Sequence, residues 1–108
     1  MGSSRDIVLT AIESRVQQVV PKGATVLLFG SQARGDAHEG SDWDLLILLK
    51  KPRVDLNDYD EVAFPLRQLG WDLGVVINPI LYSSGDWEKQ SVTPFYKNVT
   101  QDSVKLWD

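Results

Sequence analysis

The sequence predicts an α/β fold in which helices pack on a small mixed β-sheet. Segments with helical spacing of apolar residues alternate along the chain with short, continuous apolar runs. One of these runs, residues 43–49 (WDLLILL), is apolar at almost every position after its start, which is expected of a strand whose sheet is covered on both faces. The chain has 108 residues, enough for one modest core, and we expect residues 1–108 to form a single domain.

The first half of the chain is predicted to contain one long helix and two strands. Apolar residues recur at helical spacing over residues 7–20, and Pro21 ends that pattern. Residues 25–29 (TVLLF) form a short β-branched and aromatic run, which predicts a buried strand. We expect a short helical turn over residues 32–34, and the second strand over residues 43–49.

The second half is predicted to begin with a helix over residues 57–69, capped by Asn57. Pro65 lies inside this pattern and implies a kink or two shorter pieces, because proline cannot donate the helical hydrogen bond. Gly70 suits the position after the last helical turn. Residues 71–77 (WDLGVVI) are then predicted as the third strand.

The remaining segments carry turn and cap signals. The dipeptide Asn78-Pro79 is expected to end the third strand. Residues 83–86 (SSGD) resemble the capped start of a short helix, and residues 93–94 (Thr-Pro) are typical of the start of another. The tail at residues 104–107 fits a helix or an edge strand equally well.

The composition excludes several classes of protein. The formal net charge of −4 argues against direct DNA binding, because that affinity comes from Lys and Arg neutralising phosphates. The absence of cysteine excludes disulfides, zinc–thiolate sites and a cysteine nucleophile. No apolar run approaches the roughly 20 residues of a membrane span, and we find no apolar signal-peptide core near the N-terminus. We therefore expect a cytoplasmic protein with no membrane partner.

Two aspartates stand at the entrance to the second predicted strand. Asp42 and Asp44 are two positions apart, so their side chains project from the same face, with Cα atoms about 6.6 Å apart. Taken alone, the pair fits a solvated turn that leads into a strand. Convergent carboxylates at a core edge also form a divalent-cation site, and Mg²⁺ is typically held by one or two carboxylates together with substrate phosphates.

A glycine-serine turn precedes this pair. Gly30 and Ser31 follow the first predicted strand and lead into the short helical turn. Such a turn leaves backbone N–H groups free, and together with the Ser31 hydroxyl these groups can bind a phosphate. Gly30 permits the sharp turn and a close approach of the phosphate to the backbone. A phosphate site beside a metal-binding carboxylate pair outlines a site for a nucleoside triphosphate.

The segment GSQARGDAHEGSDWDLLILL, residues 30–49, resembles the signature of the minimal nucleotidyltransferases, which belong to the DNA polymerase β-like nucleotidyltransferase superfamily. That signature is Gly-Ser-x-Ala-Arg-Gly, a short variable stretch, and then Ser-Asp-x-Asp-Leu. The tail PFYKNVTQDSVKLW resembles the weaker C-terminal pattern of the same proteins. The residues of this chain that match the signature are Gly30, Ser31, Ala33, Arg34, Gly35, Ser41, Asp42, Asp44 and Leu45.

The resemblance implies the nucleotidyltransferase fold and a Mg²⁺-dependent transfer of a nucleoside monophosphate, with ATP as the expected substrate. It implies that Asp42 and Asp44 hold two Mg²⁺ ions. A third carboxylate on a later strand is also implied, and Asp72 is the candidate: it would bind one ion and help to deprotonate the acceptor hydroxyl. If residues 71–77 paired with residues 43–49, Asp72 would lie about 4.5–5.5 Å from one of the pair. The implied nucleotide- and phosphate-binding residues are Gly30, Ser31, Arg34 and Ser41.

Two residues near this motif have competing interpretations. Arg34 either contacts phosphate directly or positions the loop through an ion pair with Asp36 or Asp42, and loop positioning is the favoured interpretation. His38 is the only histidine, and we interpret it as a solvated loop residue rather than as a general base.

The acceptor is the open question. A catalytic unit of this size has little surface left for an acceptor, and the resemblance to minimal proteins implies a separate partner, such as a helical HEPN-type ribonuclease toxin that is adenylylated by its antitoxin. Two alternatives remain. The chain could be a catalytically silent module that neutralises a partner by contact, or a small-molecule transferase that completes its pocket as a dimer, as aminoglycoside nucleotidyltransferases do.

Overall fold

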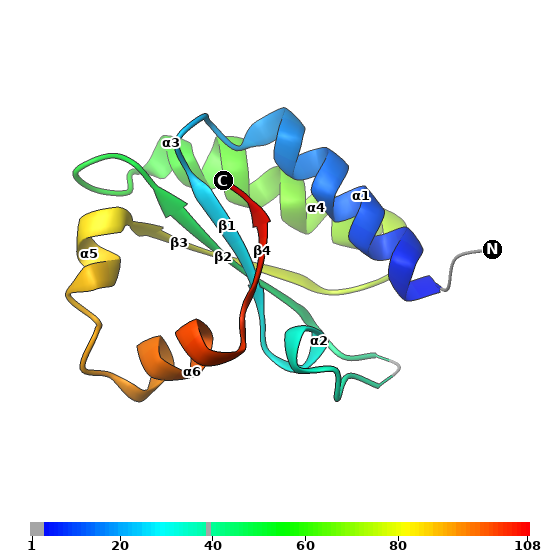
Figure 1. Ribbon diagram of the computed structural model, residues 1–108. Helices are drawn as coiled ribbons and strands as arrows, with labels where there is room; N and C mark the ends of the chain where they lie inside the picture. Colours follow the sequence, from blue (N-terminus) through cyan, green and yellow to red (C-terminus); the bar gives the residue numbers. More distant parts are fainter. Residues whose placement is uncertain (1–3, 39) are drawn as a thin grey trace.

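The computed structural model describes residues 4–38 and 40–108, and it contains a four-stranded mixed β-sheet with helices on both faces (Figure 1). The predicted fold class is confirmed. The strands are β1 Thr25–Phe29, β2 Trp43–Leu49, β3 Ile77–Ser83 and β4 Val104–Trp107. The helices are α1 Ser4–Val19, α2 Ser31–Arg34, α3 Leu56–Asp58, the π-helical segment η1 Tyr59–Ala63, α4 Phe64–Leu73, α5 Ser84–Glu88 and α6 Pro94–Asp102.

The strand order is β3-β2-β1-β4, and the directions of the strands bring three strand ends together. β1 pairs with β2 in antiparallel fashion, with Phe29 opposite Asp44. β2 pairs with β3 in parallel fashion, with Trp43 opposite Ile77 and Asp44 opposite Asn78. The C-terminal end of β1 and the N-terminal ends of β2 and β3 therefore lie at the same end of the sheet. β4 pairs antiparallel to β1 and forms the other edge, so the tail is a strand.

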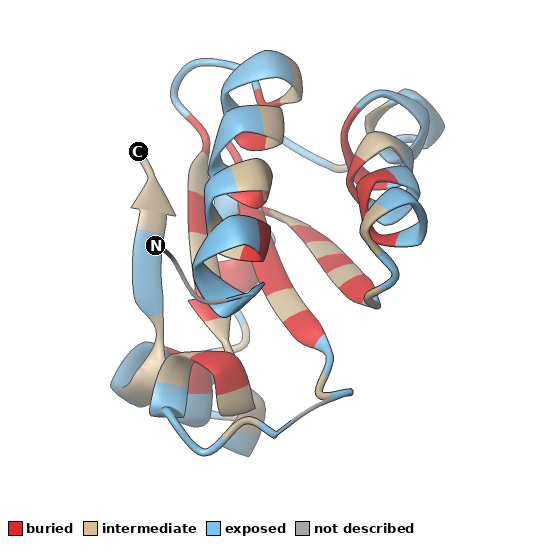
Figure 2. Cartoon of the chain, turned by 90° about the vertical axis from the view of Figure 1, so that its right-hand side faces the viewer, coloured by how far each residue is buried: buried red, intermediate tan, exposed pale blue. Residues whose placement is uncertain are grey.

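Two hydrophobic clusters sandwich the sheet. α1 and α4 pack on one face, and β2 contributes every second side chain to that cluster, including Trp43, Leu45 and Ile47. On the opposite face a smaller cluster is built around Leu46 and Trp87. Figure 2 shows the resulting alternation of buried and partly exposed positions along the strands. Because Asp44 and Leu46 are two positions apart, Asp44 belongs to the second face.

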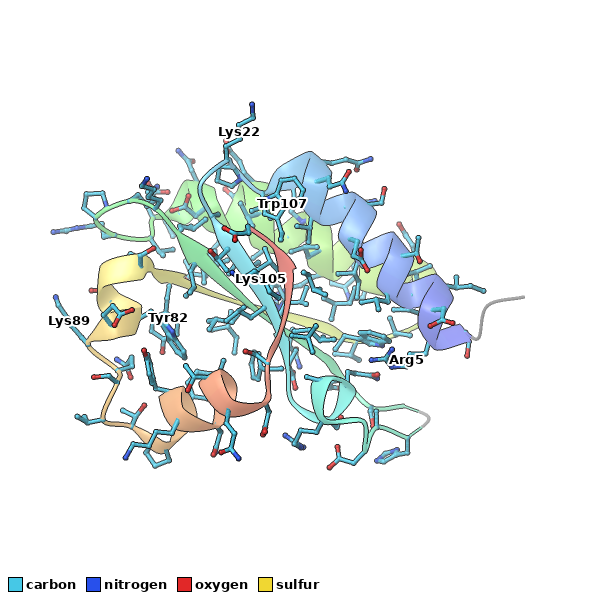
Figure 3. The ribbon with its side chains drawn as sticks, in the orientation of Figure 1. Arg5, Lys22, Tyr82, Lys89, Lys105 and Trp107 are labelled. Carbon is cyan, nitrogen blue, oxygen red and sulfur yellow. The ribbon has the colours of Figure 1, made fainter. Side chains whose placement is uncertain are left out.

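An aromatic cluster attaches α5 and α6 to that second face. The ring centroids of Trp87 and Phe95 lie 5.7 Å apart, those of Phe29 and Phe95 lie 5.6 Å apart, and those of Tyr82 and Trp87 lie 5.4 Å apart. Both helices have the predicted caps: the Ser83 hydroxyl accepts from the N–H of Asp86, and the Thr93 hydroxyl accepts from that of Tyr96. Figure 3 shows Tyr82 on the side of the sheet that carries these helices.

The helix predicted over residues 57–69 begins earlier and ends later. Its cap is Asp55 rather than Asn57, because the Asp55 carboxylate accepts from the N–H of Asp58 while the Asp58 carboxylate accepts from the N–H of Asp55. The hydrogen bond from the Lys51 ammonium, followed by that from the Asp58 backbone, lowers the pKa of Asp55 below its usual value. The two shorter pieces that Pro65 implied are observed: the π-helical segment η1 ends at Ala63, and Pro65 lies in the first turn of α4.

The prediction of a third strand over residues 71–77 is wrong. α4 continues to Leu73 and ends at Gly74, which adopts the left-handed conformation. β3 begins at Ile77 and includes Asn78 and Pro79, which were expected to end a strand. Proline is tolerated there because β3 is an edge strand, where a missing backbone N–H costs no ladder bond if it faces outward.

Gly70 does not end the helix but allows the chain to return closely against it. A Cβ atom at Gly70 would lie 2.8 Å from the carbonyl oxygen of Val75 and 3.1 Å from the backbone nitrogen of Ile77. We expect Gly70→Ala to lower the free energy of unfolding by about 1–3 kcal/mol, measured by urea denaturation, because β3 must shift. The matched control is Gly85→Ala in α5, where a Cβ meets nothing within 4 Å. Equal stability of the two variants would contradict this close approach.

Within residues 4–38 and 40–108, none of the helices combines the length and the hydropathy that a bilayer crossing requires.

Candidate nucleotide site

The predicted glycine-serine turn lies at the C-terminal end of β1. Gly30 has φ 75° and ψ −158°, a conformation that is essentially restricted to glycine. Its carbonyl oxygen accepts hydrogen bonds from the N–H groups of Ala33 and Arg34, both at 3.1 Å, so α2 begins directly at Ser31. The N–H groups of Ser31 and Gln32 precede the first intrahelical donor and have no acceptor within the helix.

Gly30 also lies directly against one of the two predicted aspartates. A Cβ atom at Gly30 would collide with Oδ2 of Asp44. This contact follows from the sheet register, in which Phe29 at the end of β1 is opposite Asp44 on β2. The glycine therefore provides both the sharp turn and the space that the Asp44 carboxylate occupies.

The structure brings Asp42 and Asp44 together through a third side chain, Asn78. The Asn78 amide nitrogen donates to Oδ2 of Asp42 at 3.0 Å and to Oδ1 of Asp44 at 3.2 Å. Asn78 stands opposite Asp44 in the parallel pairing of β2 and β3, so the two side chains lie on the same face. Sequence reasoning missed this residue because it interpreted Asn78-Pro79 as a strand end.

Asp72 does not join this group. It is an exposed residue in the last turn of α4, not the first residue of a strand, so the expected position across from the aspartate pair is wrong. Among the residues that the structure describes, no three Asp, Glu, His or Cys side chains come together as a metal-binding group. The convergent carboxylates of the site are thus the pair Asp42 and Asp44.

The residues of the connecting loop make local contacts. The Arg34 guanidinium forms an exposed ion pair with Asp36, with Nε and Oδ2 3.3 Å apart, which is one of the two partners considered for it. The Ser41 hydroxyl accepts from the N–H of His38 at 2.9 Å, and the Ser41 N–H donates to the carbonyl of His38 at 3.0 Å. Ser41 therefore closes the turn that leads into Asp42.

A small cavity borders the turn on the face of α6. It measures about 190 Å³ and is lined by Gly30, Arg34, Phe95 and Asn98, among others. Arg34, at the end of α2, therefore lines this cavity and also forms the ion pair with Asp36.

A larger cleft of about 720 Å³ opens on the opposite face of β2. Arg5 lines it from the first turn of α1, 5.6 Å from the ring centroid of Trp43, and donates to the backbone carbonyl of Gln32 at 2.8 Å. Figure 3 shows Arg5 between α1 and α2. Ser41 lines the same cleft, so the cleft adjoins the aspartate loop. Sequence reasoning had no local signal for it, because its walls come from distant segments.

This arrangement is typical of nucleotidyltransferases: a Gly-Ser turn ends one strand, and two convergent aspartates begin the strand beside it. Residues 8–105 match the nucleotidyltransferase domain family, and the chain belongs to that family.

Individual relatives agree with this assignment. “Putative protein adenylyltransferase MJ0604” of Methanocaldococcus jannaschii is 34% identical over 99 residues, which are 92% of this chain and 90% of that protein. The solved “Structure of putative minimal nucleotidyltransferase” is 27% identical with a TM-score of 0.62 and covers 93% of both chains. A second solved structure, “Crystal structure of the toxin-antitoxin with AMP-PNP”, has a TM-score of 0.66 at 20% identity over 92% of this chain and 72% of that one. At that identity the second structure supports the fold alone.

Proposed function

We propose that this chain transfers the adenylyl group of ATP to a hydroxyl group of a partner protein, and that Asp42 and Asp44 bind Mg²⁺ for this reaction. The observation that carries the proposal is the convergence of the two carboxylates next to the Gly30-Ser31 turn. The 34% identical relative is named a protein adenylyltransferase, and AMP-PNP, an ATP analogue, is named with the toxin–antitoxin structure of similar fold. Both names favour ATP as the nucleotide.

The residues present fit a divalent cation. Asp42 and Asp44 supply oxygen ligands, the donor type that Mg²⁺ prefers, and the side chain that bridges them is the neutral amide of Asn78. Asp42 is exposed and Asp44 is partly exposed, so substrate phosphates and water can complete the coordination. When bound, the ion neutralises the charge that develops on the phosphate oxygens during transfer.

The Gly30-Ser31 turn and Arg34 bind the rest of the triphosphate. The Ser31 hydroxyl and the first N–H groups of α2 donate to phosphate oxygens, and Arg34 contributes positive charge from the wall of the small cavity. Ser41 holds the loop so that Asp42 faces the same site. Asp72 has no part in this proposal, because it lies on α4.

The chemical step is an in-line displacement at the α-phosphorus. The acceptor oxygen forms a bond to the α-phosphorus while the bond from that phosphorus to the bridging oxygen of the β-phosphate breaks. Pyrophosphate leaves, the adenylyl group stays on the acceptor, and the hydroxyl proton passes to water at the exposed side of Asp42. Two carboxylates and a phosphate-binding turn contribute positioning and charge stabilisation, which are the main contributions to phosphoryl-type transfer.

The partner is proposed to be a small helical toxin of the HEPN type, with this chain acting as its antitoxin. The fold is shared with a protein whose structure is described as a toxin–antitoxin, and the relative named a protein adenylyltransferase has nearly the same length as this chain. Asp42 is exposed, so a tyrosine, serine or threonine of such a partner can reach the site directly from solvent.

Transfer can be tested with ATP labelled separately on the α- and γ-phosphates. The chain, Mg²⁺ and the protein encoded beside it are incubated with each form, and the labelled protein is identified by mass spectrometry. We expect α-label but no γ-label on the partner, and a mass increase of one adenylyl group, which is AMP less one water. A tight complex without label would contradict the enzymatic proposal and favour neutralisation by contact, whereas label on a small molecule would contradict the protein acceptor.

A further inference from the structure

Asn78 is the only residue in the described part of the chain that the structure shows bridging both aspartates. A side-chain amide carries two N–H hydrogens, and Asn78 uses its amide nitrogen for both contacts, one to each carboxylate. The amide is neutral, so it draws two negative groups together without cancelling their charge. A compact group with a net charge of about −2 remains, and a single divalent cation matches it.

The backbone of Asn78 is held firmly in place. The N–H of Trp43 donates to the carbonyl of Val76 at 2.8 Å, which joins the starts of β2 and β3. Ile77 and Pro79, on either side of Asn78, are buried. On the side away from Asn78, the Asp44 carboxylate is in contact with Gly30. Asp44 is therefore confined between a glycine of one neighbouring strand end and an amide of the other.

We propose that Asn78 is a positioning residue that holds Asp42 and Asp44 in their metal-binding arrangement before any nucleotide binds, and that it limits the nucleotide-free site to one divalent cation. The inference rests on the metal-binding role of the two aspartates proposed above. A second ion would need another anionic ligand facing the pair from β3, and at that position the chain has a hydrogen-bond donor instead. The proposal of one ion in the nucleotide-free site differs from the two ions that the family resemblance implied.

The consequence is a specific pattern of metal binding in two variants. Asn78→Ala removes both hydrogen bonds, so the carboxylates repel each other and separate. Residues that orient metal ligands typically change metal affinity by about 10–100-fold, and we expect a loss of that size with one ion still bound. Asn78→Asp has nearly the same shape but adds a third carboxylate, and we expect it to bind a second ion.

Isothermal titration of Mn²⁺ into the nucleotide-free protein tests this pattern, with Asp44→Asn and Asn57→Ala as controls. Asn57 is an exposed asparagine on α3 and lines neither cavity of the site, so its variant should bind like the parent. Thermal unfolding without metal confirms that each variant is folded. Parent-like affinity for Mn²⁺ in Asn78→Ala, or a single bound ion in Asn78→Asp, would overturn the proposed role of Asn78 but not the metal-binding role of the two aspartates. If the parent bound no Mn²⁺, or if Asp44→Asn bound Mn²⁺ as the parent does, the metal-binding proposal would be overturned and this inference with it.

Discussion

Asp44→Asn is expected to lower kcat/KM for adenylyl transfer by about 10³-fold or more while leaving the domain folded. Asp44 is the more buried of the two aspartates and the one in contact with both Gly30 and Asn78. An amide cannot supply the negative charge that holds a divalent cation, and metal stabilisation of a phosphoryl transition state contributes several kcal/mol, with each 1.36 kcal/mol corresponding to about tenfold in rate. The rate of pyrophosphate release at saturating Mg²⁺ measures the effect.

The matched control for this prediction is Asp72→Asn. Each substitution replaces an aspartate by the isosteric asparagine and so removes one carboxylate charge. Asp72, however, is exposed on α4 and outside the site. We expect the control to retain parent activity. Transfer by Asp44→Asn at the parent rate, or an equal loss in Asp72→Asn, would show that the aspartate pair is not the catalytic centre.

The accuracy of sequence reasoning differed between the two halves of the chain for a physical reason. β1 and β2 were predicted with the bounds that the structure has, because each is a short, mainly apolar run that ends at a glycine or a charged residue. In the second half, residues 71–73 (WDL) have the same local character as a strand start, yet they form the last turn of α4. Gly70 lies inside the helix and is packed against the returning chain, whereas Gly74 ends the helix with φ 73°, and the sequence alone does not tell these two uses of glycine apart.

The site shows the same division. Its motif residues are close in sequence, so the resemblance to the family signature predicted Gly30, Ser31, Asp42 and Asp44 as one group. Asn78 reaches the aspartates only through the parallel register of β2 and β3, and that register depends on where β3 begins. An error of six residues in the start of one strand was therefore enough to select Asp72 in place of Asn78. Long-range pairing, not local propensity, decides which polar side chain faces the pair.

Gly30→Ala is expected to lower kcat/KM by about 10²-fold or more. Two independent features of Gly30 produce this effect. Its φ of 75° and ψ of −158° cost a residue with a side chain about 1–3 kcal/mol of strain, and the new Cβ would collide with Oδ2 of Asp44. Asp44 must then move away from the position in which it meets Asp42 and Asn78, and a displacement of about 1 Å at a catalytic group is sufficient for a loss of that size.

Gly35→Ala separates these two features. Gly35 ends α2 with φ 84°, so alanine is strained there as well, but its Cβ would meet nothing within 4 Å. We expect Gly35→Ala to lower the free energy of unfolding, by about 1–2 kcal/mol, and to leave kcat/KM near the parent value. The two variants should thus differ strongly in activity and little in stability, as measured by urea unfolding and pyrophosphate release. If Gly30→Ala were as active as Gly35→Ala, the contact between Gly30 and Asp44 would have no catalytic consequence, and backbone strain alone would explain the glycine.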